Sequence, residues 1–218
     1  MSGKLYAVSE SSLQFFGTMT ASISHEINNV LAIINENAGL LEDFTLMADK
    51  GAPIDPERLK TLAGKIMTQI RRADTIIKKM NKFAHSVDGP IKRIDLGDLV
   101  ELVVALSNRF ASMRGITLEL KHPANPVIIK TNDFFLENLL WLCLDFAMDA
   151  TGQEKTVILG VEMAGAGAVI KLSGIEDAPG RISGITGDDG LLAALKGKLD
   201  IDPETGGVLL TLPSDINK

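Results

Sequence analysis

The chain of 218 residues contains a single cysteine, Cys143, so it has no disulfide framework and fits a reducing compartment. No uncharged apolar run reaches 18 residues, which excludes a membrane-spanning helix on sequence grounds. Residues 1–12 are polar and lack the apolar centre of a secretory signal peptide. We therefore expect a cytoplasmic protein that has no input domain and receives any signal from another chain.

Basic runs are also missing, and the net charge is −6. Nucleic acid is therefore not expected as a direct partner. The apolar share of 45% is ordinary for a protein that buries a core, and the length allows one or two domains.

Proline is absent before Pro53, and apolar residues recur in this stretch at spacings of three, four and seven. This pattern predicts an amphipathic helix from about Ser9 to Asp49. After a short connector, Asp55 is placed as the cap and Pro56 as the first-turn residue of a second long helix, which ends before Gly89-Pro90. Two such helices form an antiparallel hairpin.

A lone hairpin leaves its two apolar stripes half covered. Pairing with a second copy gives a four-helix bundle, and each buried Leu or Ile contributes roughly 1.5–3 kcal/mol. We therefore predict a homodimer. The alternative is that the stripes pack against the C-terminal half of the same chain.

Residues 90–218 read as alternating helices and strands. The predicted helices are Leu99–Met113, Asp133–Thr151 and Leu191–Lys198. The predicted strands are 116–120, 127–129, 156–163, 168–172 and 206–213, and residues 91–96 form either a short strand or a linker. This order predicts an α+β sandwich with helices on one face of a mixed sheet. We thus divide the chain into a hairpin domain, 1–89, and a sandwich domain, 90–218.

The segment Ser24-His25-Glu26-Ile27-Asn28-Asn29 lies inside the first predicted helix. His25 falls off the apolar stripe, Glu26 follows it directly, and Asn29 lies one turn further on the same side. A solvent-facing imidazole beside a carboxylate can act as a nucleophile. Two other interpretations stay open: an ordinary surface histidine, and the zinc-binding H-E-x-x-H helix, although position 29 is Asn and so the second ligand is missing.

This segment resembles the phospho-acceptor box of two-component histidine kinases, whose dimerisation helix carries it. The resemblance implies that His25 takes the phosphoryl group, that Glu26 assists as a base, and that Asn29 helps to dephosphorylate a partner. The second half of the chain is similar to the ATP-binding domain of the same family. The helix Leu136–Thr151 is similar to its metal-binding helix, and Gly206–Pro213 to its last strand.

The similarity stops at the residues that hold the nucleotide. Leu142 and Phe146 stand where the family has two Asn that ligate magnesium, and neither side chain offers the oxygen donors a hard cation needs. Asp145 is placed away from the pocket by its step of about 100° along the helix, and Asp149 could face it, although one carboxylate without the Asn pair is a weak site. At Leu172-Ser173-Gly174 the adenine-reading Asp is missing, and Asp177-Ala178-Pro179-Gly180 is a possible remnant. The later Gly-rich box is reduced to Asp188-Asp189-Gly190, whose acids would repel a triphosphate. We therefore expect a degenerate ATPase-type sandwich around Leu142, Phe146, Gly174 and Gly190, with no bound cofactor.

The function that these features imply is histidine phosphotransfer in a phosphorelay, between His25 and aspartates of response-regulator receiver domains. The receiver would supply the magnesium. The alternatives are an autophosphorylating sensor kinase with a divergent ATP site, and a non-catalytic regulator that binds a kinase or receiver. Asn29 further suggests phosphatase action on a receiver.

Overall fold

The computed structural model describes residues 2–176 and 189–217. The chain divides into two compact units, one formed by Met1–Thr18 with Phe83–Lys218 and the other by Met19–Lys82. The predicted α+β class is confirmed: a long helical hairpin is followed by a mixed sheet with helices on one face. The boundary between residues 89 and 90 stays a prediction.

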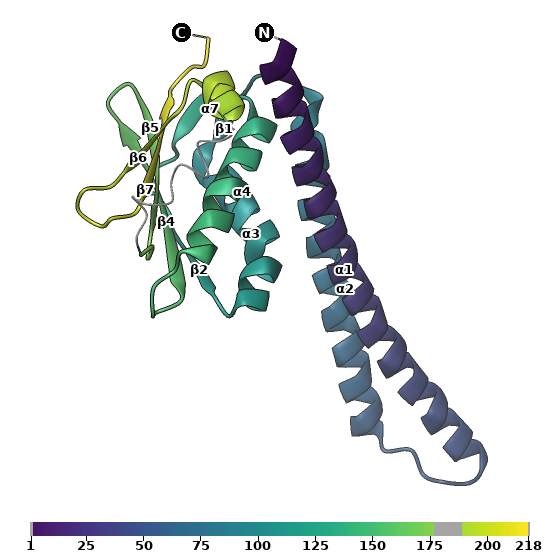
Figure 1. The fold of residues 1–218 in the computed structure, drawn as a ribbon. Coiled ribbons are helices and arrows are strands. Elements are labelled where there is room, and N and C mark those ends of the chain that lie inside the picture. The colour runs from purple at the N-terminus through teal and green to yellow at the C-terminus, as the bar shows by residue number, and fades with distance from the viewer. Residues whose placement is uncertain (1, 177–188, 218) are drawn as a thin grey trace. The chain divides into compact units, whose positions relative to one another are not determined.

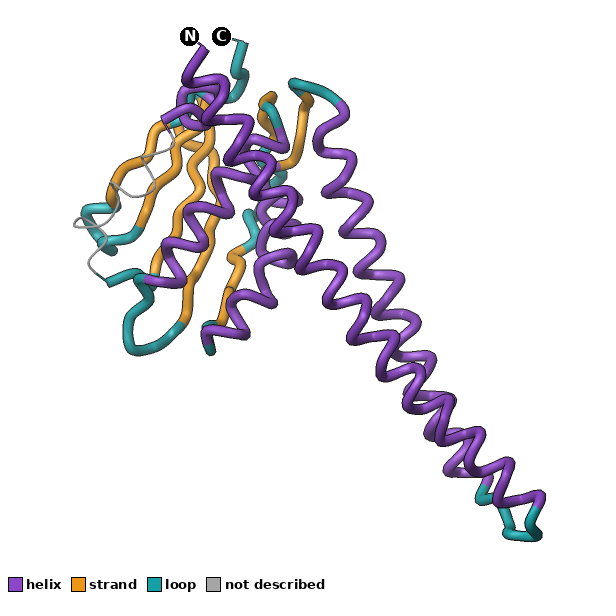
Figure 2. The backbone as a smooth tube through the Cα atoms, turned by 45° about the vertical axis from the view of Figure 1, so that its right-hand side comes forward, coloured by secondary structure: helices purple, strands orange, loops and turns teal. Residues whose placement is uncertain are grey.

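The hairpin consists of α1 (Ser2–Asp49) and α2 (Pro56–Ala84). The backbone N–H of Glu57 donates to the Asp55 side chain over 3.0 Å, so Asp55 caps α2 as predicted. Helix α1 begins seven residues earlier than the predicted Ser9. Figure 2 shows the two helices running antiparallel from a short loop.

The two helices in unit Met19–Lys82 pack on one another through apolar residues that recur at helical spacings. Met19, Ile23 and Val30 of α1 are buried, as are Leu62 and Ile76 of α2. Other apolar residues on the same helices stay exposed in the single chain: Leu31, Leu40, Leu46, Met47, Met67, Ile70 and Ile77. The hairpin therefore buries one seam and leaves further apolar surface in solvent.

The other unit contains a five-stranded sheet in the order β2-β4-β5-β7-β6. Its strands are β2 (Thr117–Lys121), β4 (Thr156–Ala164), β5 (Gly167–Ser173), β7 (Val208–Pro213) and β6 (Lys198–Ile201). Strands β2 and β4 are parallel and the remaining pairs are antiparallel, so the sheet is mixed as predicted. Two short strands, β1 (Lys92–Asp95) and β3 (Ile128–Thr131), form a separate antiparallel pair.

The helices α3 (Leu96–Arg114), α4 (Asp133–Asp149) and α7 (Asp189–Leu195) cover one face of this sheet (Figure 1). The inward side chains of the strands alternate with outward ones; in β7, Val208, Leu210 and Leu212 are buried. Helix α3 ends at Gly115, whose φ of 68° is the left-handed conformation that glycine adopts most easily. The predicted stop at Arg114-Gly115 is confirmed.

Two further details differ from the sequence-based prediction. Strand β6 was not predicted, and the last helix ends at Leu195 rather than Lys198. Lys196, with a φ of 49°, and Gly197 turn the chain so that Lys198 already pairs with Thr211 of β7.

The N-terminal end of α1 packs on α4 through an aromatic cluster, which we define as Phe15, Phe16, Phe83 and Phe134. Phe16 stacks on Phe83 with ring centroids 5.4 Å apart, and Phe15 meets Phe83 edge-on at 5.5 Å. Both Phe15 and Phe16 also contact Phe134. Beside the cluster, the buried Asn138 amide lies 3.4 Å and 3.5 Å from the Ser11 and Ser12 hydroxyls. Part of the α1 stripe therefore packs on the C-terminal half of the chain.

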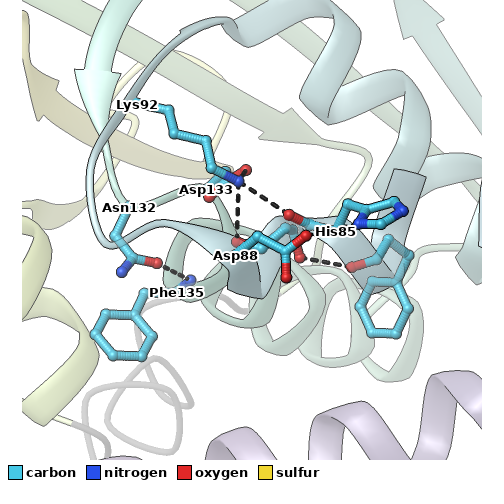
Figure 3. Close-up of polar contacts among 8 residues, drawn as sticks. His85, Asp88, Lys92, Asn132, Asp133 and Phe135 are labelled. Atoms are coloured by element: carbon cyan, nitrogen blue, oxygen red, sulfur yellow. Dashed lines mark hydrogen bonds and ion pairs between the residues drawn. The ribbon is translucent and has the colours of Figure 1, made fainter. Parts of the chain in front are cut away.

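The Lys92 side chain of β1 contacts η1 and α4 just after the end of α2 (Figure 3). Its ammonium donates to the His85 carbonyl at 2.9 Å and the Asp133 carboxylate at 3.1 Å, and lies 3.5 Å from the Ser86 carbonyl. His85 and Ser86 belong to η1 (His85–Asp88), the 3-10 turn after α2, and Asp133 begins α4. A cation thus sits at a helical C-terminus and an anion at a helical N-terminus, as the helix dipoles favour. We call this arrangement the Lys92 staple.

Candidate functional site

His25 lies on the solvent side of α1, as predicted from the spacing. Its side chain is exposed, whereas Ile23 and Val30 are only 5% and 0% exposed. The continuous helix on both sides fixes the backbone of His25. Because the apolar stripe faces α2, the imidazole projects from a part of the helix surface outside this seam.

Asn29 shares the exposed part of the helix with His25, and Glu26 lies at the edge of that part. Glu26 is half-buried, and Asn29 is exposed. In the part of the chain that the structure describes, no hydrogen bond or ion pair engages His25, Glu26 or Asn29. The three side chains are therefore available to an incoming group, and no contact within the chain orients the His25 ring.

The two other histidines have different surroundings. The Nδ1 atom of His85 lies 2.6 Å from Asp88 Oδ2 at the end of α2, so a carboxylate already holds this ring. His122 is exposed just after β2. His85 therefore already has a carboxylate partner within the chain, and His122 does not lie on a helix.

Leu142 and Phe146 lie on α4, and both are half-buried. The Arg114 guanidinium of α3 reaches the two acids of this helix: Nη2 lies 2.8 Å from Asp145 Oδ1, and Nε lies 3.5 Å from Asp149 Oδ1. The sequence allowed Asp149 to face the nucleotide pocket; in the structure its carboxylate is exposed and contacts Arg114 of α3. One guanidinium therefore contacts both acids of this part of α4 and offsets one of their two negative charges.

Gly174 lies at the end of β5 with a φ of 85°. A Cβ atom at this position would collide with the carbonyl oxygen of Thr156. The backbone geometry thus requires glycine here whether or not a nucleotide binds. Gly190 is half-buried in α7, while the proposed remnant Asp177–Gly180 lies outside the described residues.

Among the described residues, no group of three His, Cys, Asp or Glu side chains lies close enough together to hold a metal ion. No described helix combines the length and apolarity that a bilayer crossing requires. Cys143 is fully buried in α4, and this burial raises the pKa of its thiol to about 12. A buried, protonated thiol is a poor nucleophile and a poor metal ligand.

Comparison with known proteins finds similar folds among histidine kinases. The catalytic domain of histidine kinase ThkA, in a nucleotide-free form, matches at 14% identity and a TM-score of 0.49, over 59% of this chain and 99% of that domain. Histidine kinase AdeS of Acinetobacter baumannii matches at 14% identity and 0.45, over 87% of this chain and 98% of that one. The ATP-binding domain of PrrB from Mycobacterium tuberculosis matches at 18% identity and 0.45, over 58% and 98%.

No protein-family model matches the sequence, and no curated protein matches it either. All three structural similarities lie below 20% identity and below a TM-score of 0.5. We therefore base the proposed function on the side chains of this chain rather than on its structural neighbours.

Proposed function

We propose that this chain is a dimeric histidine phosphotransfer protein that carries a phosphoryl group between aspartates of receiver domains. The observation that carries the proposal is the exposed, unengaged imidazole of His25 on a stiff helix, with Glu26 next to it. A group that must meet a large protein partner needs to be open to solvent and fixed in position.

In the proposed step, the Nε2 lone pair of His25 attacks the phosphorus of an aspartyl phosphate in line. The bond between phosphorus and the aspartate oxygen breaks, and the carboxylate leaves with the electron pair. The imidazole ring then carries a positive charge, which is relieved when the Nδ1 proton moves to Glu26 or to water. Reversal of this step passes the phosphoryl group to the next receiver, and the receiver supplies the magnesium.

The side chains on α4 support a function in which this chain does not take its phosphoryl group from ATP. Leu142 and Phe146 offer no oxygen ligands, and the carboxylates of Asp145 and Asp149 are engaged with Arg114. The exposed apolar residues of the hairpin, among them Leu31, Met67 and Ile70, support pairing with a second copy.

A direct test offers the purified chain two sources of phosphate. We expect no label on His25 from ATP with magnesium, and label from phosphorylated receiver domains tested as a panel. His25→Gln should abolish this transfer, whereas His122→Gln, which also removes an exposed imidazole, should leave it unchanged. Label taken from ATP alone would instead make the chain a histidine kinase, and receiver binding without transfer would make it a non-catalytic regulator.

A further inference from the structure

Helix α2 is strongly basic in an otherwise acidic chain. It carries eight of the 22 Lys and Arg residues but only two of the 28 Asp and Glu residues, which gives it a net charge of +6. The other residues of the chain together carry −12. Such a separation of charge creates a local positive potential that the net charge of the protein conceals.

Four of these cations form a line along the helix, which we call the basic stripe: Arg58, Lys65, Arg72 and Lys79. Their spacing of seven residues places them on one face. Within the described part of the chain, Lys65, Arg72 and Lys79 form no ion pair. These three cations are therefore not paired directly with acidic residues of α1 in the described part of the chain.

The basic stripe borders a groove between α1 and α2 within unit Met19–Lys82. This groove of about 670 Å³ is lined by Ile33 and Glu36 on one side and by Lys65 and Thr68 on the other, among other residues. On α1, Glu36 of this lining follows His25 by eleven residues, about three turns, which places the two side chains on nearly the same face. On α2, the face of Lys65 continues by steps of seven to Arg72 and Lys79. His25 and the stripe therefore face the same side of the hairpin.

The register of the hairpin places His25 between two of these cations. Phe16 of α1 stacks on Phe83 of α2, and Arg58 of α2 lies over the ring of Phe44 of α1. In both pairs, the residue number on α1 and the residue number on α2 add to about 100. His25 is then level with about residues 74–77 of α2. Because a helix rises about 1.5 Å per residue, Arg72 and Lys79 lie within roughly one turn on either side of that level.

We propose that Arg72 and Lys79 hold the acidic active-site surface of a phosphorylated receiver against His25. This inference rests on the proposed phosphotransfer function and names the chemistry by which its partner is recognised. Phosphoryl transfer at an aspartyl phosphate uses a magnesium ion, and carboxylates bind that ion. The partner therefore presents negative charge around the reacting phosphorus. Cations on both sides of His25 match that surface, speed its approach and favour the reactive orientation.

The test compares two variants of the full chain with the same change in charge. Arg72→Glu with Lys79→Glu reverses the stripe, and Arg93→Glu with Lys121→Glu reverses two exposed cations of β1 and β2 in the other unit. Thermal unfolding and loading of His25 by phosphoramidate check that each variant is intact. We then measure kcat/KM for transfer from the phosphorylated receiver that the panel identifies, over a series of salt concentrations.

We expect the stripe variant to lose about 10–100-fold in kcat/KM at low salt, and the control variant to stay within about twofold of the parent chain. The parent rate should fall as salt rises, and the stripe variant should lose most of that dependence. Equal rates and equal salt dependence for the two variants would overturn the inference and leave phosphotransfer intact. Unchanged transfer combined with lost binding to phosphatidylserine vesicles or duplex DNA would also overturn it. If the parent chain accepts phosphate from no receiver, the proposed function itself fails.

Discussion

At the scale of single residues, the chemistry depends on the pair His25 and Glu26. If Glu26 accepts the ring proton, Glu26→Gln removes a base but keeps size and hydrogen-bonding capacity, so transfer should slow roughly 10²–10⁴-fold. The measurement is single-turnover transfer from a phosphorylated receiver. Glu42→Gln, an exposed residue of the same helix, is the matched control and should transfer normally. A normal rate of transfer in Glu26→Gln would show that Glu26 does not act as a base and is only a solvated surface residue.

Cys143 allows a second prediction at this scale. Burial raises the pKa of its thiol from 9.0 to about 12, and a backbone hydrogen bond lowers it by a smaller amount. The thiol therefore stays protonated in the folded chain at mildly alkaline pH, and its reaction with a disulfide reagent should be limited by unfolding. Because the pKa of this thiol is higher in the folded than in the unfolded chain, its contribution to the free energy of unfolding is fully present below pH 9. That contribution is lost as the pH rises toward about 12. Rapid labelling under native conditions would contradict the described burial.

At the scale of elements, the Lys92 staple connects η1, β1 and α4. Lys92→Met removes the ammonium and leaves the Asp133 carboxylate, whose side chain is only 13% exposed, without its cation. We expect a loss of about 1–3 kcal/mol in the free energy of unfolding, measured in urea. Lys198→Met breaks the ion pair with Asp200, in which the Lys198 side chain is 75% exposed, and should cost little. Equal effects of the two substitutions would show that the staple does not stabilise the junction.

At the scale of the whole molecule, the exposed apolar residues of the hairpin predict the oligomeric state. Ile70 and Ile77 lie seven residues apart on α2, and they are 46% and 43% exposed in the single chain. Ile70→Glu with Ile77→Glu would place charges inside the proposed dimer interface, so the dissociation constant should rise at least about 100-fold, which corresponds to roughly 2.7 kcal/mol. Sedimentation over a range of concentrations measures this change.

Met113→Glu tests whether any apolar-to-charged change has the same effect. Met113 is 72% exposed at the end of α3 and lies in the other unit. This variant should sediment as the parent chain does. A monomeric parent chain would contradict the proposed dimer, and the exposed hairpin surface would then await another partner.

The sequence by itself determined the parts of this protein that depend on neighbours along the chain. The hairpin helices followed from apolar spacing, the start of α2 from Asp55 and Pro56, and the end of α3 from Gly115. The exposure of His25 followed from its position between Ile23 and Ile27. These features are local, because a helix repeats every 3.6 residues and a cap acts within one turn.

Only the tertiary structure decided which distant residues meet. It packed Phe15 and Phe16 on Phe134, turned Asp149 to Arg114, and paired the short strand β6 with β7. No local pattern carries this information, since such a contact depends on how the intervening chain folds and which surface is left to bury. The groove between α1 and α2 that Lys65 lines arose in the same way, because the register between two helices is set by packing rather than by either sequence pattern alone.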